Sequence, residues 1–305
     1  MSHHLEERLI RNRIDEMHKY RRDTIYSQMR ELITDDRRKV LDLVNHGLAL
    51  VDDELDSNPD PLKIISHMRI IFRKSYENEH IETSTDAEHA VVDLSYALKE
   101  LACAPWWCIK NRAIGKNTYK EVLGFWETEE KNFQRKGKIL DKNTLDNITL
   151  GIGTFVAAHF LFVLDSPRAT YLNDNEFSEL SRAYGLAVKL ADNLCDFKDD
   201  IKKGLVNIPK EEIHHVKGVS IREDKIIEII PESLALSNEY INNEYHKIQQ
   251  NFAYADRLMI RTMARRTIWN KSNEKLYLFQ KFCHSWLEQA KEFATKEISR
   301  EMRFN

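Results

Sequence analysis

The chain has 305 residues, of which 42% are hydrophobic and 31% charged, a composition typical of a folded globular protein and not of a disordered one. Its formal net charge of −3 at pH 7 weighs against a general nucleic-acid-binding surface, so we expect no nucleic-acid partner. Only 9 glycines and 6 prolines interrupt the sequence, which is sparse for a β-sandwich or a doubly wound sheet, and we therefore predict an all-α fold of long helices.

Apolar residues at helical spacing place the expected helices along the chain. The sequence Asn58-Pro59-Asp60-Pro61 ends one of them, and Gly204 is expected to cap the C-terminal end of another. No repeat, low-complexity tract or linker is evident, so we predict one helical domain over residues 1–305. In chain order the expected helices are 1–30, 37–55, 62–82, 87–112, 119–134, 150–164, 175–203, 211–215, 231–253, 255–270 and 274–301.

The aromatic residues at helical spacing are expected to lie mostly in the core, with a minority lining a cavity. Trp106 and Trp107 belong to the helix expected at 87–112, and Trp126 to the next one. The least charged helix, 150–164, contains Gly151 and Gly153, and small residues let another helix or a ligand approach the backbone closely.

Several features predict a cytoplasmic protein. Residues 1–23 are charged throughout and lack the apolar region of a secretory signal. The longest apolar stretch, Ile152–Leu164, contains His159 and is shorter than the roughly 20 residues that span a bilayer. The four cysteines have no paired C-x-x-C spacing and are interpreted as buried thiols in a reducing compartment. We expect no transmembrane segment.

A first acidic cluster, Asp52-Asp53-Glu54-Leu55-Asp56, comes at the end of the helix expected at 37–55. Asp52 and Asp56 are one helical turn apart and share a face. The C-terminal end of a helix carries a partial negative charge, so carboxylates there are unfavourable unless a cation lies nearby. The pattern indicates a cation site.

A second acidic cluster lies in the helix expected at 175–203. Asp192, Asp196 and Asp200 follow one another at a spacing of four and stack along one helical face, with Asp199 beside them. Like charges at this spacing repel by a few tenths of a kcal/mol per pair. One interpretation is a solvated acidic face, but the presence of two such clusters favours a cation shared between them.

Oxygen ligands without sulfur suit Mg²⁺, which keeps several waters and is usually shared with substrate phosphates. If the two clusters face each other, they hold Mg²⁺ ions bridged by a diphosphate and neutralise the charge of a departing pyrophosphate. The chain has no G-x-S-x-G motif and no P-loop, and Glu88-His89 does not have the Glu-x-x-His spacing that a di-iron bundle needs.

The segments that carry these clusters resemble the squalene/phytoene synthase family. Residues 32–56, LITDDRRKVLDLVNHGLALVDDELD, are similar to its first aspartate helix. Residues 183–209, AYGLAVKLADNLCDFKDDIKKGLVNIP, resemble its second signature, and residues 150–164 lie where the family has a glycine-bearing helix. The resemblance covers residues 32–209. It implies an isoprenoid-synthase fold, a single-domain helical bundle around a central apolar cavity.

The family's activity implies Mg²⁺-dependent ionisation of an allylic prenyl diphosphate, farnesyl or geranylgeranyl, followed by head-to-head condensation of two such molecules. By this resemblance Asp52 and Asp56 match the first catalytic, metal-binding pair and Asp196 and Asp200 the second. Asp192 occupies the position of an asparagine that contributes to metal and substrate binding. The positive residues expected to bind the substrate are Lys202, Lys203, Arg21 and Arg22.

The chain departs from the family pattern at several phosphate-binding positions. Ala49, Cys195 and Leu205 replace arginines, and each lost arginine removes a bidentate phosphate donor. Asn207 replaces a tyrosine. Because head-to-head condensation needs two diphosphates held at once, these losses raise the expectation of a single-substrate enzyme, either a terpene cyclase or a prenyl diphosphate phosphatase.

A third hypothesis is a non-catalytic assembly factor of the same fold, although a scaffold has no use for a repulsive row of aspartates. Under either enzymatic hypothesis we expect a prenyl diphosphate as the ligand. Peripheral association with a membrane would serve the release of an apolar product.

Overall fold

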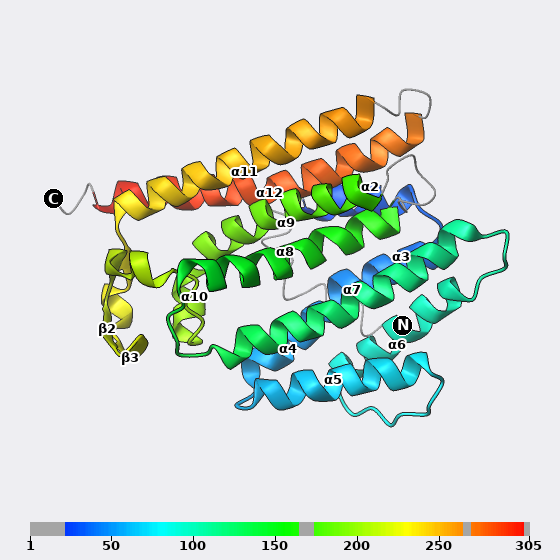
Figure 1. The fold of residues 1–305 in the computed structure, drawn as a ribbon, viewed down its shortest axis with the longest axis horizontal. Helices are drawn as coiled ribbons and strands as arrows, with labels where there is room; N and C mark the ends of the chain where they lie inside the picture. Colours follow the sequence, from blue (N-terminus) through cyan, green and yellow to red (C-terminus); the bar gives the residue numbers. More distant parts are fainter. Residues whose placement is uncertain (1–21, 165–173, 265–269, 302–305) are drawn as a thin grey trace.

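The computed structural model describes residues 22–164, 174–264 and 270–301 (Figure 1). Long helices make up most of these residues and pack side by side as a bundle, which confirms the predicted all-α fold. Short strands occur only between residues 216 and 236 of the described chain.

The first part of the bundle carries the first acidic cluster. Helices α2 (Arg22–Glu31) and α3 (Asp35–Asp42) are followed by a π-helical turn, η1 (Leu43–Gly47), and by α4 (Leu48–Ser57). Wider turns of this kind occur frequently at functional sites. A Cβ added at Gly47 would lie 3.2 Å from the Cβ of Ala90, so this turn packs closely against the helix that contains Ala90.

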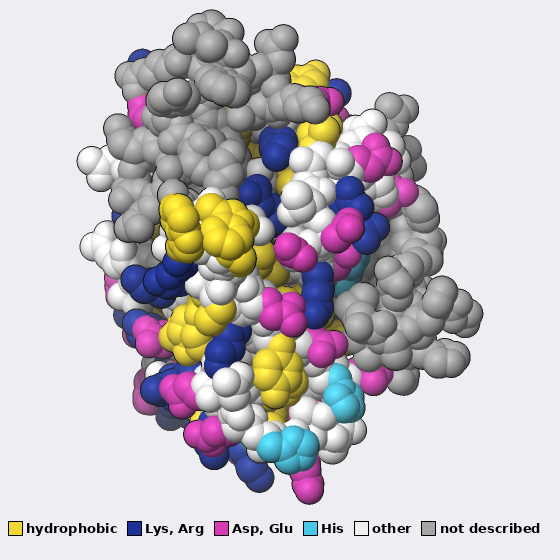
Figure 2. All heavy atoms as spheres, turned by 90° about the vertical axis from the view of Figure 1, so that its right-hand side faces the viewer, with side chains coloured by type: hydrophobic (Ala, Val, Ile, Leu, Met, Phe, Trp, Pro, Cys, Tyr) yellow, Lys and Arg dark blue, Asp and Glu magenta, His cyan; other side chains and the backbone are white. Residues whose placement is uncertain are grey.

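The next helices are α5 (Pro61–Tyr76), α6 (Asp86–Ala102) and α7 (Ile109–Gln134). The prediction of one helix over 87–112 was wrong, because α6 ends at Ala102 and a turn precedes α7. Pro105 lies in this turn, and a proline inside a helix removes a hydrogen bond and clashes with the preceding turn. Trp106 and Trp107, expected in the core, are 75% and 66% exposed. Figure 2 shows the side of the molecule that lies at the right of Figure 1, where hydrophobic side chains reach the surface among charged ones.

The centre of the bundle is formed by α8 (Lys142–Leu164) and α9 (Asp174–Cys195), followed by the short α10 (Phe197–Lys202). The helix expected at 175–203 is therefore interrupted at Asp196. A Cβ added to Gly153 of α8 would overlap the backbone of Gly185 on α9, and the reverse is also true. The expectation that small residues in 150–164 permit close helix packing is thus confirmed at Gly153.

Helix α8 is long and apolar enough to span a membrane by length and composition. However, 67% of its most apolar window is buried inside the fold, and a buried core helix passes the same test. In Figure 1 it runs beside α9 in the middle of the bundle.

Between α10 and the last two helices lies a small extended region that the sequence analysis missed. Helix η3 (Lys210–His215) is followed by β1 (Val216–Lys217), β2 (Val219–Arg222), β3 (Lys225–Ile229), the short η4 (Pro231–Ser233) and β4 (Ala235–Leu236). Strand β1 pairs with β4, and β2 pairs with β3, both antiparallel. The helix expected at 231–253 was therefore wrong over its first residues.

Two long helices complete the bundle, α11 (Asn238–Ala264) and α12 (Asn270–Glu301), which run together along one side in Figure 1. The break expected near residue 254 does not exist. No glycine or proline interrupts α11, and Phe252, Ala255 and Met259 are all fully buried on its inner face.

Of the four cysteines, Cys103 and Cys108 flank the turn that separates α6 from α7, and Cys103 is exposed. The prediction of buried thiols is confirmed only for Cys283. Cys195, the last residue of α9, is half-buried.

Candidate active site

A cavity of about 270 Å³ lies between η1 and α4, α7, α8, α9 and α12. Segments far apart in the sequence therefore contribute to its wall. One part of the wall is acidic, with Asp52 from α4, Glu129 from α7 and Asp192 from α9, joined by Lys189. Another part is apolar and aromatic, and includes Leu48, Ile152, Phe125, Phe155, Phe160, Val188 and Trp286. One aspartate from each predicted cluster thus lines the same cavity.

Glu129 is the most buried of these acids, with 7% of its surface exposed. Burial and, to a smaller extent, the negative charge of Asp52 raise the pKa of the Glu129 carboxyl to about 7. Lys189, a hydrogen bond from Asn132 and Arg135 act in the opposite direction. The charge of Asp52, in the first acidic cluster, therefore acts on Glu129 of α7.

Lys189 supplies a positive charge at the acidic end of the cavity. Its ammonium donates to the Oδ2 atom of Asp192 over 2.6 Å, an ion pair between residues three apart on α9. Burial would lower the pKa of the Lys189 ammonium, but Asp192, Asp200 and Glu129 outweigh it and raise the pKa above its ordinary value. The lysine is therefore held in its charged form.

A chain of hydrogen bonds connects Glu129 with Asp200 of the second acidic cluster. Asn132 donates to Glu129, and Arg135 donates to both Asn132 and Asn207. Asn207 in turn donates to Asp200 Oδ2 over 2.6 Å. Glu129 and Asn132 are three residues apart on α7 and share one helical face, and Arg135 directly follows the end of the helix. These hydrogen bonds thereby hold the carboxylates of Glu129 and Asp200 in fixed positions relative to each other.

Asp200 is half-buried, and burial raises the pKa of its carboxyl to about 6. Lys189 lowers this pKa and Asp192 raises it, while the hydrogen bond from Asn207 also lowers it. Asp200 therefore interacts electrostatically with two residues of the cavity wall, although it does not itself line the cavity.

The apolar end is built from aromatic rings of different helices. Phe125 of α7 and Phe155 of α8 are stacked with ring centroids 4.6 Å apart. His159 lies 4.6 Å from Phe160, and burial lowers the pKa of its imidazole to about 3, so the ring is neutral near pH 7. A neutral imidazole among phenyl rings keeps this end of the cavity free of formal charge.

The other predicted site residues that the structure describes do not line this cavity. Asp196 is exposed and precedes α10. The guanidinium of Arg22 lies 3.9 Å above the ring of Trp286 and donates to Ser285 and Gln289, so it supports the cavity wall from behind. Arg21 and the side chain of Asp56 lie outside the described residues.

Lys202 and Lys203 line a second cavity, of about 540 Å³, between the ends of α7 and α10 and the β2–β3 hairpin. Lys202 forms an exposed ion pair with Asp199, with its Nζ atom 3.0 Å from Oδ1. The structure therefore divides the predicted ligand set, with Asp52 and Asp192 at one cavity and the two lysines at the other.

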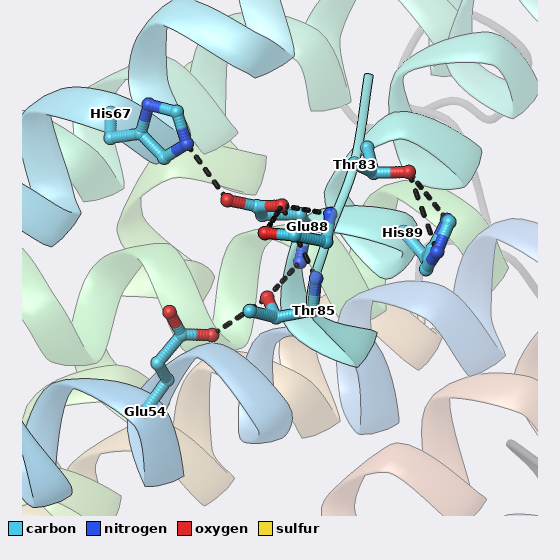
Figure 3. A network of polar contacts seen from close by, with 7 residues as sticks. Glu54, His67, Thr83, Thr85, Glu88 and His89 are labelled. Atoms are coloured by element: carbon cyan, nitrogen blue, oxygen red, sulfur yellow. Dashed lines mark hydrogen bonds and ion pairs between the residues drawn. The ribbon is translucent and has the colours of Figure 1, made fainter. Parts of the chain in front are cut away.

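Glu54, also from the first acidic cluster, belongs to a separate network (Figure 3). It accepts a hydrogen bond from the Thr85 hydroxyl, which also caps the N-terminal end of α6. Glu88 completes this capping box and accepts hydrogen bonds from Ser84, Thr85 and His67. This part of the cluster stabilises the start of α6.

The donor set at the acidic end suits a hard cation, because Asp52, Glu129 and Asp192 all offer carboxylate oxygens. Among the described residues, no three His, Cys, Asp or Glu side chains are close enough together to hold a metal ion unaided. Mg²⁺ does not require such a cage, since it is commonly held by one or two carboxylates together with waters and phosphate oxygens. The residues present therefore fit Mg²⁺ as a partial ligand set.

Comparison with known proteins adds no relative: the chain matches no protein-family model and no curated protein significantly. The resemblance to the squalene/phytoene synthase family accordingly remains a prediction from the motifs.

Sequence reasoning missed three charged residues of this region, Glu129, Lys189 and Arg135. Lys189 carried a usable signal, because it lies three residues before Asp192 and so shares its helical face. Glu129 lies on α7 and Arg135 directly after it, both more than 50 residues from either acidic cluster, and only the tertiary fold brings them there.

Proposed function

We propose that this protein ionises an allylic prenyl diphosphate with the help of Mg²⁺, and that its cavity holds one such substrate at a time. The observation that carries the proposal is that one cavity joins a carboxylate-lined end to an aromatic end. An allylic prenyl diphosphate is divided in the same way, with a charged diphosphate at one end and an apolar chain at the other.

At the acidic end, Asp52 and Asp192 would hold Mg²⁺ together with the diphosphate. The metal supplies neutralisation of the charge that develops on the diphosphate as the carbon–oxygen bond breaks. The bonding electrons leave with the diphosphate oxygen, and the allylic carbon becomes positive. At the other end, ring faces such as those of Phe155 and Phe160 attract that positive charge, each by on the order of 1–2 kcal/mol.

The cavity volume favours one substrate over two. Pockets for drug-sized ligands commonly measure roughly 300–1,000 Å³, and this cavity, at about 270 Å³, falls just below that range. Head-to-head condensation requires two prenyl chains in contact. We therefore place single-substrate ionisation first, giving a cyclic product by proton loss or a hydrolysed one by water attack, and head-to-head transfer second.

The test is incubation of the purified protein with Mg²⁺ and geranyl, farnesyl or geranylgeranyl diphosphate, with pyrophosphate release and product mass as readouts. We expect pyrophosphate release and a product of unchanged carbon number. A product of doubled carbon number would instead support head-to-head condensation. Absence of pyrophosphate release with every chain length would support the non-catalytic assembly factor.

A matched pair of variants tests the site itself. Both aspartates are exposed, but Asp52→Asn removes a carboxylate that lines the cavity, whereas Asp53→Asn removes a neighbour that does not. We expect Asp52→Asn to lower turnover by about 100-fold or more, and Asp53→Asn to retain most of it. Equal effects of the two substitutions would contradict the assignment of the acidic end as the site of ionisation.

A further inference from the structure

Lys189 brings a permanent positive charge into a place where a divalent cation is expected. Its side chain lines the cavity, is 23% exposed, and is paired with Asp192 over 2.6 Å. It also interacts electrostatically with Glu129 and Asp200. A single ammonium therefore compensates carboxylates from α7, α9 and α10.

The packing of α9 on α8 fixes the base of this side chain. Gly185 and Gly153 bring the two helix backbones together, and a Cβ added at Gly153 would lie 3.1 Å from the Cβ of Lys189. The next residues of α9, Leu190 and Ala191, are buried in the core. The lysine consequently points along the cavity-lining face of α9 that also carries Asp192.

We propose that Lys189 is a built-in counter-ion that competes with a divalent cation for Asp192. When no metal is bound, the ammonium neutralises Asp192, and a divalent cation that enters the cavity must displace it. This inference rests on the proposed function only for the expectation that such a cation enters here.

The competition links metal binding to the binding of a phosphate ligand. A metal that binds Asp192 without a phosphate ligand displaces the Lys189 ammonium from Asp192. The unpaired ammonium then lies close to the metal, and the repulsion between the two positive charges weakens metal binding. A metal that arrives with a diphosphate brings negative oxygens that the displaced ammonium can bind instead. Lys189 therefore makes the metal and the diphosphate bind cooperatively.

The experiment measures the affinity for Mn²⁺, used as a spectroscopic substitute for Mg²⁺, in the absence and presence of inorganic diphosphate. Without diphosphate, we expect Lys189→Gln to bind Mn²⁺ about tenfold or more tightly than the unaltered protein, because no ammonium competes. Diphosphate should then tighten Mn²⁺ binding less in Lys189→Gln than in the unaltered protein.

Two variants serve as controls. Lys189→Arg keeps a cation at the same position and should retain the weak metal affinity. Lys247→Gln removes a lysine of α11 that forms a comparable pair with Glu244, three residues away, outside the cavity. It should leave Mn²⁺ affinity unchanged. An equal affinity of Lys189→Gln and the unaltered protein for Mn²⁺ overturns the proposal.

Loss of Lys189 also leaves acids without their counter-ion, which by itself favours unfolding of the variant in metal-free buffer. In that case circular dichroism is recorded during refolding with millimolar Mg²⁺. Recovery of the native spectrum supports replacement of the ammonium by a metal, and failure to recover it overturns the proposal. The Mn²⁺ measurement contains no prenyl substrate, so its result is independent of the turnover assay. Tighter Mn²⁺ binding by Lys189→Gln, together with no turnover by the unaltered protein, would reject the proposed function alone. Turnover by the unaltered protein, together with an unchanged Mn²⁺ affinity of Lys189→Gln, would reject this inference alone.

Discussion

At the scale of single residues, the buried guanidinium of Arg135 joins two parts of the acidic region. It is 5% exposed and donates to the Asn132 side chain, the Val206 carbonyl and the Asn207 side chain. Burial lowers the pKa of Arg135 to about 10, although Asp200 and Glu129 act to raise it, so it remains charged at neutral pH. One cation thus satisfies acceptors of α7 and of the segment after α10.

Replacement of Arg135 by methionine should destabilise the protein by about 2–4 kcal/mol, because buried acceptors lose their donor and Asp200 loses a nearby positive charge. Urea unfolding followed by circular dichroism measures the change. The control is Arg182→Met, at an exposed position on α9, which should stay within about 0.5 kcal/mol of the parent. If both variants lose no more than about 0.5 kcal/mol in free energy of unfolding, the hydrogen bonds made by Arg135 do not stabilise the fold.

His159 predicts a specific dependence of stability on pH. Burial lowers the pKa of its imidazole to about 3, below its ordinary value of 6.5, and Nε2 has no hydrogen-bond partner in the structure. Because the folded state disfavours the charged ring, the stabilisation is complete above pH 6.5 and is lost as the pH falls from 6.5 towards 3. At pH 4.5 this loss amounts to about 3 kcal/mol.

Between pH 7.5 and pH 4.5, the free energy of unfolding should fall in both proteins, but the fall should be about 3 kcal/mol smaller in His159→Leu than in the parent. Urea unfolding at the two pH values measures the difference. His246→Leu, at an exposed position on α11, controls for the loss of a histidine. Parallel loss of stability in the parent and His159→Leu would contradict the burial of a neutral imidazole.

At the scale of elements, the crossing of α8 over α9 positions the cavity. Gly153 lines the cavity itself and contacts the backbone of Gly185, so the two helices meet without intervening side chains. Lys189 and Asp192 follow Gly185 on α9, one and two turns further along. The distance between the helices therefore sets where these two charges lie.

Gly153→Ala should destabilise the protein by about 3 kcal/mol, because the added methyl group overlaps the backbone of α9 and forces the helices apart. The matched control is Gly124→Ala in α7, where an added Cβ meets no atom within 4 Å. That substitution should stabilise the protein by roughly 0.5–1 kcal/mol, since alanine favours the helix over glycine. Thermal unfolding of both variants checks the prediction, which fails if the two alanines have effects of the same sign.

The sequence predicted the helical elements better than their interruptions. The turn around Trp106 was missed because the apolar pattern was followed through Pro105, although a proline is a strong signal for the end of a helix. The β2–β3 hairpin was missed because its turn residues, Glu223 and Asp224, adopt positive φ angles of 51° and 60° without the usual Asn-Gly or Asp-Gly pair.

For the candidate site, periodicity predicted which acids share a helical face but not which of them reach the cavity. Asp52 and Asp192 both line it, whereas Asp196 falls at the break between α9 and α10 and does not line it. The position of a helix break depends on tertiary packing, which a spacing of four does not record.

At the scale of the whole molecule, the cavity depends on the complete bundle. Its wall combines residues from Val44 to Trp286, so no short segment of the chain contains the site. A ligand that joins the acidic and aromatic ends contacts several helices at once. Its binding free energy is then added to the stability of the folded state, because the unfolded chain has no such cavity.

Mg²⁺ together with a non-hydrolysable prenyl diphosphate analogue should therefore stabilise the protein against heat. At an analogue concentration 100 times the dissociation constant, the stabilisation is about 2.7 kcal/mol. For a chain of this size we expect the melting temperature to rise by roughly 4 °C. Either component alone should give a smaller rise, because the diphosphate and the metal each complete the other's ligand set.

The variants of the acidic end separate a bound ligand from a general effect of salt. Asp52→Asn and Asp192→Asn should each lose most of the rise in melting temperature, while Asp53→Asn should keep it, since Asp53 does not line the cavity. Differential scanning calorimetry with equal MgCl₂ in every sample makes the comparison. A rise that survives in Asp52→Asn and Asp192→Asn would mean that the analogue binds elsewhere, for example beside Lys202 and Lys203 in the larger cavity, and the acidic end would lose its assignment.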